Sequence, residues 1–195
     1  MVRNKILFVG LFFLITGMVS AQSTKWQIDK SHTKIQFVTK HMKISNVTGQ
    51  FKEYSGDIKA DQEDFTDVDI RVTIPVESID TDNEKRDEHL RGEDFFEVEE
   101  YPEIKFQSVS ISKEGDSQYK LKGELTIKDV TRTETFKMEH LGTVEAMGDI
   151  RAGFKLTGKI DRFDYNVDWD SSFGQGLVVG RDVEINIDAE LIKQE

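Results

Sequence analysis

The alternation of apolar and polar residues with a period of two constrains the fold of this chain more than any other feature. Such alternation is typical of a β-strand with one buried face and one solvated face. It is clearest in residues 68–76, 119–127 and 183–191. Weaker alternation occurs in residues 35–37, 47–58, 104–111, 133–141 and 154–160. Together with a short strand at residues 26–28, the pattern predicts eight or nine strands.

Each of these strands has one apolar face, and an open sheet would leave that face in water. A closed or sandwiched antiparallel sheet is therefore the economical solution. Four glycines fall inside the strand patterns, where they weaken pairing unless they serve a bend or a close approach of the backbone. They are Gly49, Gly56, Gly123 and Gly158. We predict an all-β protein built as an antiparallel β-barrel of about eight strands.

One segment breaks the strand pattern and reads as a short helix near residues 82–91. The sequence Thr81-Asp82-Asn83-Glu84 has the form of a capping box, in which the Thr81 hydroxyl would accept from a backbone N–H while Glu84 reaches back. Gly92 is placed to end the helix.

The first 21 residues have the three parts of a secretory signal peptide: basic residues Arg3 and Lys5, an apolar run over 6–19, and the small-residue sequence Val19-Ser20-Ala21. The run is shorter than the roughly 20 residues of a membrane-spanning helix, which disfavours the alternative of a retained anchor. We therefore expect residues 1–21 to be removed, residues 22–195 to form one domain, and the protein to be periplasmic, with extracellular release as the alternative.

The composition narrows the choice of partners. The formal net charge is −11, and removal of Arg3 and Lys5 would make it more negative. This charge disfavours nucleic acid and anionic membrane surfaces. The chain has no cysteine, so neither disulfides nor thiol chemistry contributes.

The sequence lacks the motifs of common catalytic and cofactor sites. The histidines at 32, 41, 89 and 140 lack the short spacings of a local metal site, and no nucleophile elbow, phosphate loop or dinucleotide fingerprint is present. The acidic run around residues 97–103 is typical of a solvated face. We predict a protein that is not an enzyme and needs no cofactor or metal, with an enzyme acting on an isoprenoid as the weaker alternative.

Several ordered segments carry a family resemblance that covers essentially all of residues 22–195. Its most specific parts are the helical signature Arg86-Asp87-Glu88-His89-Leu90 and the stretch from Gly123 to Thr131. The other matching segments are Trp26-Gln27-Ile28-Asp29 with Ser31-His32, Phe37 to His41, Gly49-Gln50-Phe51, Ser78 to Thr81, Asp94-Phe95-Phe96, Tyr101-Pro102, Gly153-Phe154 and Arg162 to Tyr165. In these segments the chain resembles the YceI-like family of exported lipid-binding proteins.

The resemblance implies an extended lipocalin-like barrel with an internal apolar tunnel. It also implies a long-chain isoprenoid ligand, such as a polyprenyl phosphate or an isoprenoid quinone, bound for transport, storage or protection. We expect no nucleic-acid partner, no stable membrane anchor, and a monomer or homodimer.

Nine residues are candidates for ligand contact. Seven occupy inward positions of the predicted strands: Phe37, Phe51, Phe106, Leu121, Leu125, Phe154 and Leu156. The alternative is that they only fill the core. Arg86 and His89 belong to a compact cationic cluster on the predicted helix and could bind an anionic head group, because arginine holds phosphate with two parallel hydrogen bonds. The alternative is that they make local pairs that hold the helix in place.

A second functional hypothesis is a packed, stress-related periplasmic module that acts through contacts with another protein. That hypothesis requires an exposed apolar patch. The outward positions of the predicted strands are charged or polar, which argues against it.

Overall fold

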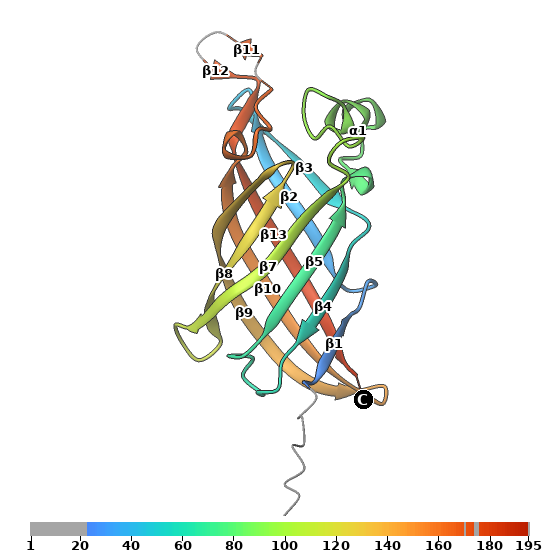
Figure 1. Ribbon diagram of the computed structural model, residues 1–195, viewed down its shortest axis with the longest axis vertical. Coiled ribbons are helices and arrows are strands. Elements are labelled where there is room, and N and C mark those ends of the chain that lie inside the picture. Colours follow the sequence, from blue (N-terminus) through green and yellow to red (C-terminus); the bar gives the residue numbers. More distant parts are fainter. Residues whose placement is uncertain (1–22, 170, 174–175, 195) are drawn as a thin grey trace, which may run out of the picture.

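The alternating segments become strands of one antiparallel sheet in the computed structural model, which describes residues 23–169, 171–173 and 176–194 (Figure 1). The predicted signal peptide, residues 1–21, lies outside the described residues. The strands are β1 (Lys25–Ile28), β2 (Lys34–His41), β3 (Ser45–Phe51), β4 (Ser55–Lys59), β5 (Asp69–Pro75), β6 (Ile79–Asp80), β7 (Glu103–Lys113), β8 (Gln118–Ile127), β9 (Val130–Ala146), β10 (Asp149–Asp161), β11 (Ser172–Phe173), β12 (Gly176–Leu177) and β13 (Val179–Lys193). The helical elements are η1 (Val76–Ser78), α1 (Glu84–Arg91) and η2 (Arg162–Tyr165).

Eight strands close into a ring in the order β1-β4-β5-β7-β8-β9-β10-β13, and the pairing of β1 with β13 completes it. Trp26 in β1 is opposite Lys193 on one side and Ile58 on the other, so a strand of four residues joins the two ends of the ring. The sheet continues from β13 through β2 and β3 to β6. The predicted antiparallel barrel of about eight strands is confirmed, and its shape is lipocalin-like.

The ends of the barrel differ. In Figure 1, α1 and the β11–β12 hairpin lie at the upper end, while the turn between β9 and β10 and the C-terminus lie at the lower end. We call residues 84–98, which include α1, the lid segment. No helix within the described residues is long and apolar enough to cross a membrane.

Residues 47–58, predicted as one strand, form two strands that do not pair with each other. β3 pairs with β2 and β6, whereas β4 pairs with β1 and β5. The connection is fixed by buried Tyr54, whose hydroxyl donates to the Thr33 carbonyl oxygen at 2.8 Å, and by the Lys52 N–H, which donates to the Ser78 carbonyl oxygen. These two long-range hydrogen bonds turn the chain between β3 and β4. The alternation of apolar and polar residues continues through this turn, so it gave no sign of the break.

The helix was predicted in the right place, but its capping box was wrong. Asn83 is the N-cap, and its side chain accepts from the Arg86 N–H. The Thr81 hydroxyl instead donates to Asp87 Oδ1 at 2.5 Å, and Arg86 Nε donates to the same hydroxyl at 2.7 Å. Gly92 ends the helix, as predicted, with its N–H bonded to the Glu88 carbonyl oxygen.

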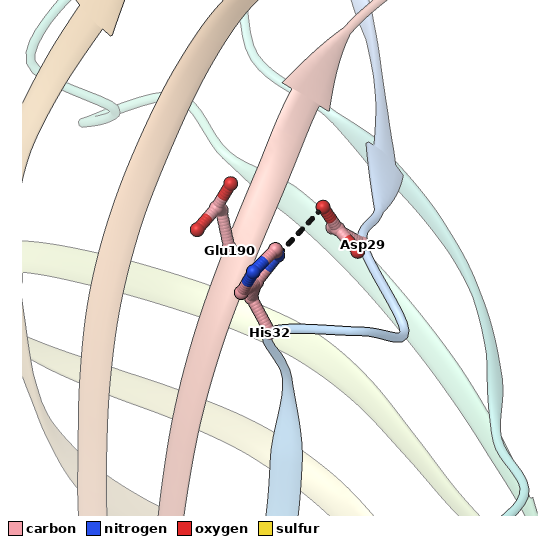
Figure 2. Close-up of side chains that lie close together, drawn as sticks. All are labelled: Asp29, His32 and Glu190. Atoms are coloured by element: carbon pink, nitrogen blue, oxygen red, sulfur yellow. Dashed lines mark hydrogen bonds and ion pairs between the residues drawn. The ribbon is translucent and has the colours of Figure 1, made fainter.

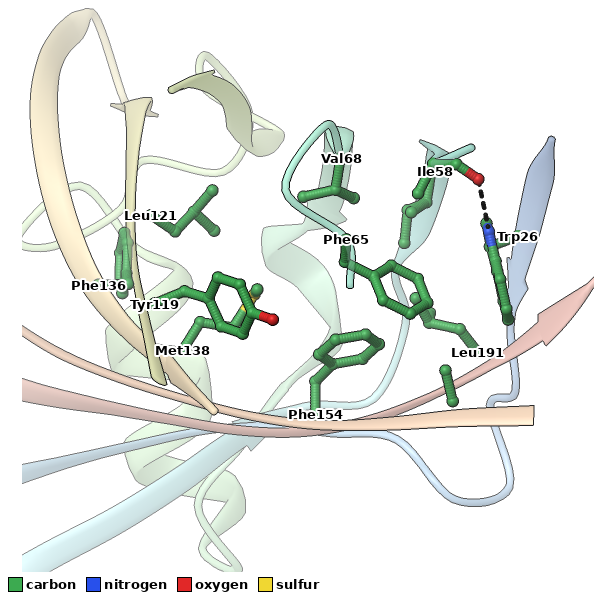
Figure 3. Packing of buried hydrophobic residues seen from close by; sticks show 12 residues of the cluster. Trp26, Ile58, Phe65, Val68, Tyr119, Leu121, Phe136, Met138, Phe154 and Leu191 are labelled. Carbon is green, nitrogen blue, oxygen red and sulfur yellow. Dashed lines mark hydrogen bonds between the residues drawn. The ribbon is translucent and has the colours of Figure 1, made fainter. Parts of the chain in front are cut away.

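The barrel interior holds two clusters of buried apolar side chains, one toward each end. In the lower cluster, Phe65 packs between Trp26 and Phe154, with ring centroids 5.0 Å and 4.8 Å away (Figure 3). The Trp26 indole also donates to the Ala60 carbonyl oxygen at 3.2 Å. We call Trp26 and Phe65 the floor of the barrel. Phe65 is held at a left-handed φ of 56°, a conformation that surrounding packing must enforce.

Candidate functional site

An apolar cavity of about 250 Å³ runs through the barrel between the two clusters. Its wall includes floor residue Phe65, strand residues from around the ring, and Leu90, Phe95 and Phe96 from the lid segment. The cavity therefore reaches from the floor to the lid segment, a shape that suits a slender apolar ligand.

The seven predicted inward residues all line this cavity: Phe37, Phe51, Phe106, Leu121, Leu125, Phe154 and Leu156. The period-two alternation thus assigned their direction correctly. Their contact with a ligand stays a prediction.

Buried polar groups in the cavity wall are bonded to protein partners. Tyr54 donates to the Thr33 carbonyl oxygen, and Tyr165 donates to Glu134 Oε1 at 2.7 Å. Burial raises the pKa of Tyr54, and burial together with the Glu134 carboxylate raises the pKa of Tyr165 far above its usual range. Arg162 donates to three backbone carbonyl oxygens, including that of Val167 at 2.6 Å. A ligand therefore meets mainly apolar surface.

Arg86 and His89 lie on the lid segment but do not line the cavity wall as Leu90 does. Arg86 donates to the hydroxyl and the carbonyl oxygen of Thr81, each at 2.7 Å. His89 contacts Asp94 Oδ2 through Nε2 at 2.8 Å. Both side chains help hold the lid segment, and their contact with a head group stays a prediction.

Three aromatic rings join the lid segment to the chain that follows η2. The ring centroid of Trp169 lies 5.4 Å from that of His89 and 5.3 Å from that of Phe95, and the His89 and Phe95 centroids lie 5.0 Å apart. We call this group the lid triad. The sequence offered no local sign of it, because Trp169 is far from the other two residues along the chain. Phe65 was likewise missed, since it is a single aromatic residue in the acidic loop between β4 and β5.

A polar cluster lies on the outer surface where β1, β10 and β13 meet. His32 Nδ1 is 3.0 Å from Asp29 Oδ2, with Glu190 beside them (Figure 2). Their ligand atoms lie within 4.8 Å of one another, which is compatible with a metal ion. However, Arg151 Nη1 already donates to Asp29 at 2.8 Å and to Glu190 at 2.6 Å, so a guanidinium supplies the positive charge.

The same cluster shifts the pKa values of Asp29 and His32. Hydrogen bonds from His32, from the Ser31 N–H and from Arg151 hold the pKa of Asp29 far below its usual range. Asp29, with the nearby charge of Glu190, raises the pKa of His32. The arrangement links the turn after β1 to β10 and β13, which is a structural function.

The expectation that outward strand positions are consistently charged or polar was wrong. Leu141 and Val144 near the end of β9 are 61% and 59% exposed, and Met147 in the following turn is 95% exposed. A register shift between Gly153 and Phe154 displaces this end of the β9–β10 pairing. Such a bulge leaves a residue outside the regular alternation.

The fold and cavity define a lipocalin-like barrel with an internal apolar site. A family model described as the YceI-like domain matches residues 26–191, and the chain belongs to this family. A UPF0312 protein of Photorhabdus laumondii is 35% identical over 161 residues, covering 82% of this chain and 83% of the relative. A UPF0312 protein of Staphylococcus aureus is 33% identical over 170 residues, covering 86% and 96%.

Solved structures agree with this assignment. BcnA of Burkholderia cenocepacia superposes with a TM-score of 0.73 at 25% identity, covering 84% of this chain and 98% of BcnA. The Campylobacter jejuni YCEI protein gives 0.70 at 33% identity, covering 80% and 90%. A polyisoprenoid binding domain from Saccharophagus degradans, implicated in plant cell wall breakdown, gives 0.62 at 12% identity, covering 87% and 98%, and shares the fold.

Proposed function

We propose that this protein binds the tail of a long-chain isoprenoid lipid, a polyprenyl phosphate or an isoprenoid quinone, inside its cavity, for transport, storage or protection. The observation that carries the proposal is an apolar cavity that extends from the floor to the lid segment and whose buried polar groups already have protein partners. The shared fold of the polyisoprenoid binding domain supports the same ligand class.

The chemistry of an isoprenoid tail fits this cavity. An eight-stranded barrel encloses only enough space for side chains and one slim ligand. Each buried methylene contributes about 0.8 kcal/mol, so a few isoprene units support tight binding without any polar contact. The role proposed is therefore binding rather than catalysis.

The N-terminal sequence supports a site of action outside the cytoplasm. The signal-peptide features of residues 1–21 favour an exported protein that carries its ligand in the periplasm. We extend the proposal to a monomer or homodimer with no lasting membrane attachment.

Native mass spectrometry of the protein purified from its own host, followed by organic extraction, tests the proposal. We expect one polyprenyl phosphate or isoprenoid quinone per chain. A protein that carries only traces of phospholipid and takes up no added isoprenoid would reject it.

For the head group, we propose that Arg86 and His89 bind an anionic group at the lid segment. Farnesyl phosphate and farnesol provide a matched pair of ligands, and Glu88→Ala on the exposed face of α1 is the control variant. Arg86→Ala should weaken farnesyl phosphate more than farnesol. Equal weakening of both ligands would show that Arg86 acts only by holding Thr81.

A further inference from the structure

Three phenylalanine rings of the cavity wall lie across glycines on neighbouring strands. Phe37 of β2 covers Gly49 of β3, Phe106 of β7 covers Gly123 of β8, and Phe136 of β9 covers Gly158 of β10. Three of the four glycines inside the strand patterns thus have a common cause, whereas the fourth, Gly56, lies against the Ile28 side chain. An added Cβ at each glycine would collide with the ring above it.

These glycines let each ring lie close to the barrel wall. All three rings line the cavity, so a ring displaced from its glycine has little room to move except inward. A cavity of about 150 Å³ accommodates one benzene ring, and this cavity measures about 250 Å³. One displaced ring would fill much of it.

Phe106 and Phe136 meet where the two apolar clusters join. Phe106 packs against both clusters, and its ring is 5.6 Å from that of Phe136 in an edge-to-face contact of 88°. Phe136 itself belongs to the lower cluster, on the floor side. We call this pair the waist of the cavity, since a ligand that extends from the lid segment to the floor must pass it.

We propose that Gly158 and Phe136 determine how long an isoprenoid chain the barrel accepts, because Gly158 lets the Phe136 ring lie back against the barrel wall and so leaves the waist open. This inference rests on the proposed function. Without that clearance, a chain entering from the lid side stops at Phe106 and Phe136, and only its first part is buried.

Gly158 gives the cleanest test of the three positions. The three atoms nearest to a Cβ there all belong to the Phe136 side chain, the two closest being ring atoms at 2.5 Å and 2.7 Å. At Gly123 the added atom would also come within 2.7 Å of the Gln107 carbonyl oxygen, which would strain the backbone. Gly153, in the same strand, is a matched control, because its Cβ would make an ordinary contact of 3.6 Å with Leu141.

The experiment compares the wild type with Gly158→Ala, Gly153→Ala, Phe136→Leu and the double variant Gly158→Ala/Phe136→Leu. Each folded protein is offered farnesol, a short isoprenoid alcohol, and solanesol, a long one, delivered from cyclodextrin. Native mass spectrometry measures the occupancy of each alcohol over a range of concentrations. The readout is the ratio of the two affinities, which a general loss of stability would not shift.

We expect Gly158→Ala to bind farnesol within about twofold of the wild type. It should bind solanesol at least roughly tenfold more weakly, because the loss of only about two buried methylene groups already has that effect. Gly153→Ala should match the wild type, and the double variant should recover solanesol, because leucine lacks the displaced ring. Phe136→Leu alone should keep or increase the preference for solanesol, which tests the waist even where Gly158→Ala does not fold.

The failure of this inference and the failure of the proposed function give different results. Unchanged solanesol binding by Gly158→Ala, a failure of Phe136→Leu to restore it in the double variant, or a loss of solanesol preference in Phe136→Leu alone would overturn the role of this pair while leaving isoprenoid binding intact. A wild type that takes up neither alcohol would overturn the proposed function itself.

Discussion

At the residue scale, Thr81 is the point to which two residues of α1 are bonded. Asp87, which is 5% exposed, accepts from both the Thr81 N–H at 3.0 Å and the Thr81 hydroxyl, and Arg86 donates to the same hydroxyl. This gives the Arg86-Asp87 part of the helical signature a structural reason. These hydrogen bonds hold α1 to Thr81, the residue that follows β6.

Asp87→Ala should therefore lower the free energy of unfolding by about 1–3 kcal/mol, because it leaves the buried Thr81 N–H without an acceptor. Urea denaturation followed by circular dichroism measures the change. Glu88→Ala, an exposed neighbour on the same helix, should change it by less than about 0.5 kcal/mol. Equal effects of the two substitutions would contradict the argument.

Two histidines should affect the pH dependence of stability in opposite directions. Burial lowers the pKa of His140, which stacks on Phe154 at 5.0 Å, so the unfolded chain binds this proton more readily than the folded chain. Its contribution destabilises the fold as pH falls below the ordinary histidine pKa of about 6.5. The raised pKa of His32 stabilises the fold below that value, and this support is lost as pH rises through the folded-state pKa.

Melting temperatures at about pH 5 and about pH 8 test the predicted direction of the pH effect for each histidine. His140→Phe should raise the melting temperature more at the lower pH, because no proton then has to be excluded from the stacked rings. His32→Gln should lower it more at the lower pH, because the protonated partner of Asp29 is lost. Shifts that are the same at both pH values for either variant would refute the corresponding assignment.

At the element scale, the lid triad fastens the lid segment to the chain after η2. An aromatic pair contributes about 0.5–1.5 kcal/mol beyond its buried area. Trp169→Ala should therefore speed hydrogen–deuterium exchange of the lid-segment amides roughly twofold to tenfold. Trp169→Phe, which retains a ring beside His89 and Phe95, is the control and should exchange more slowly than the alanine variant. Exchange that does not change in Trp169→Ala would show that the triad does not hold the lid segment.

The sequence predicted those elements whose signal is local. Alternation located the strands and the inward side chains, and Gly92 located the end of α1. The capping box failed because Thr81, three residues before Glu84, bonds to Asp87 instead, and Asn83 offers an equally good cap. Such competition between nearby side chains is decided by where the helix packs.

Features that depend on pairing across the sheet could not be predicted. That Phe136 lies over Gly158 follows from the register of β9 against β10, which alternation alone does not specify. The same holds for Phe65 at the floor and Trp169 in the lid triad, each of which meets partners distant in the sequence. The cavity was therefore expected from the family resemblance, while its floor and waist emerged only from the structure.

At the scale of the whole molecule, the two tryptophans stabilise different parts of the structure, the barrel and the lid segment. Trp26 is 7% exposed, pairs with strands on both sides and packs on the floor, so it belongs to the closure of the barrel itself. Trp169 contacts the lid segment through side-chain rings and lies outside the barrel strands. The barrel should therefore unfold as one cooperative unit, while the lid segment opens at lower free energy.

Substitution of each tryptophan by alanine separates the two units. Trp26→Ala should lower the free energy of unfolding of the whole barrel by about 3–5 kcal/mol, because it empties a core position at the site of closure. Trp169→Ala should lower it by no more than about 1.5 kcal/mol and act mainly on exchange of the lid segment. Urea denaturation at matched protein concentration gives both values. Equal global losses would mean that the lid segment and the barrel unfold together, in which case a ligand could not leave through local opening of the lid segment without loss of the barrel.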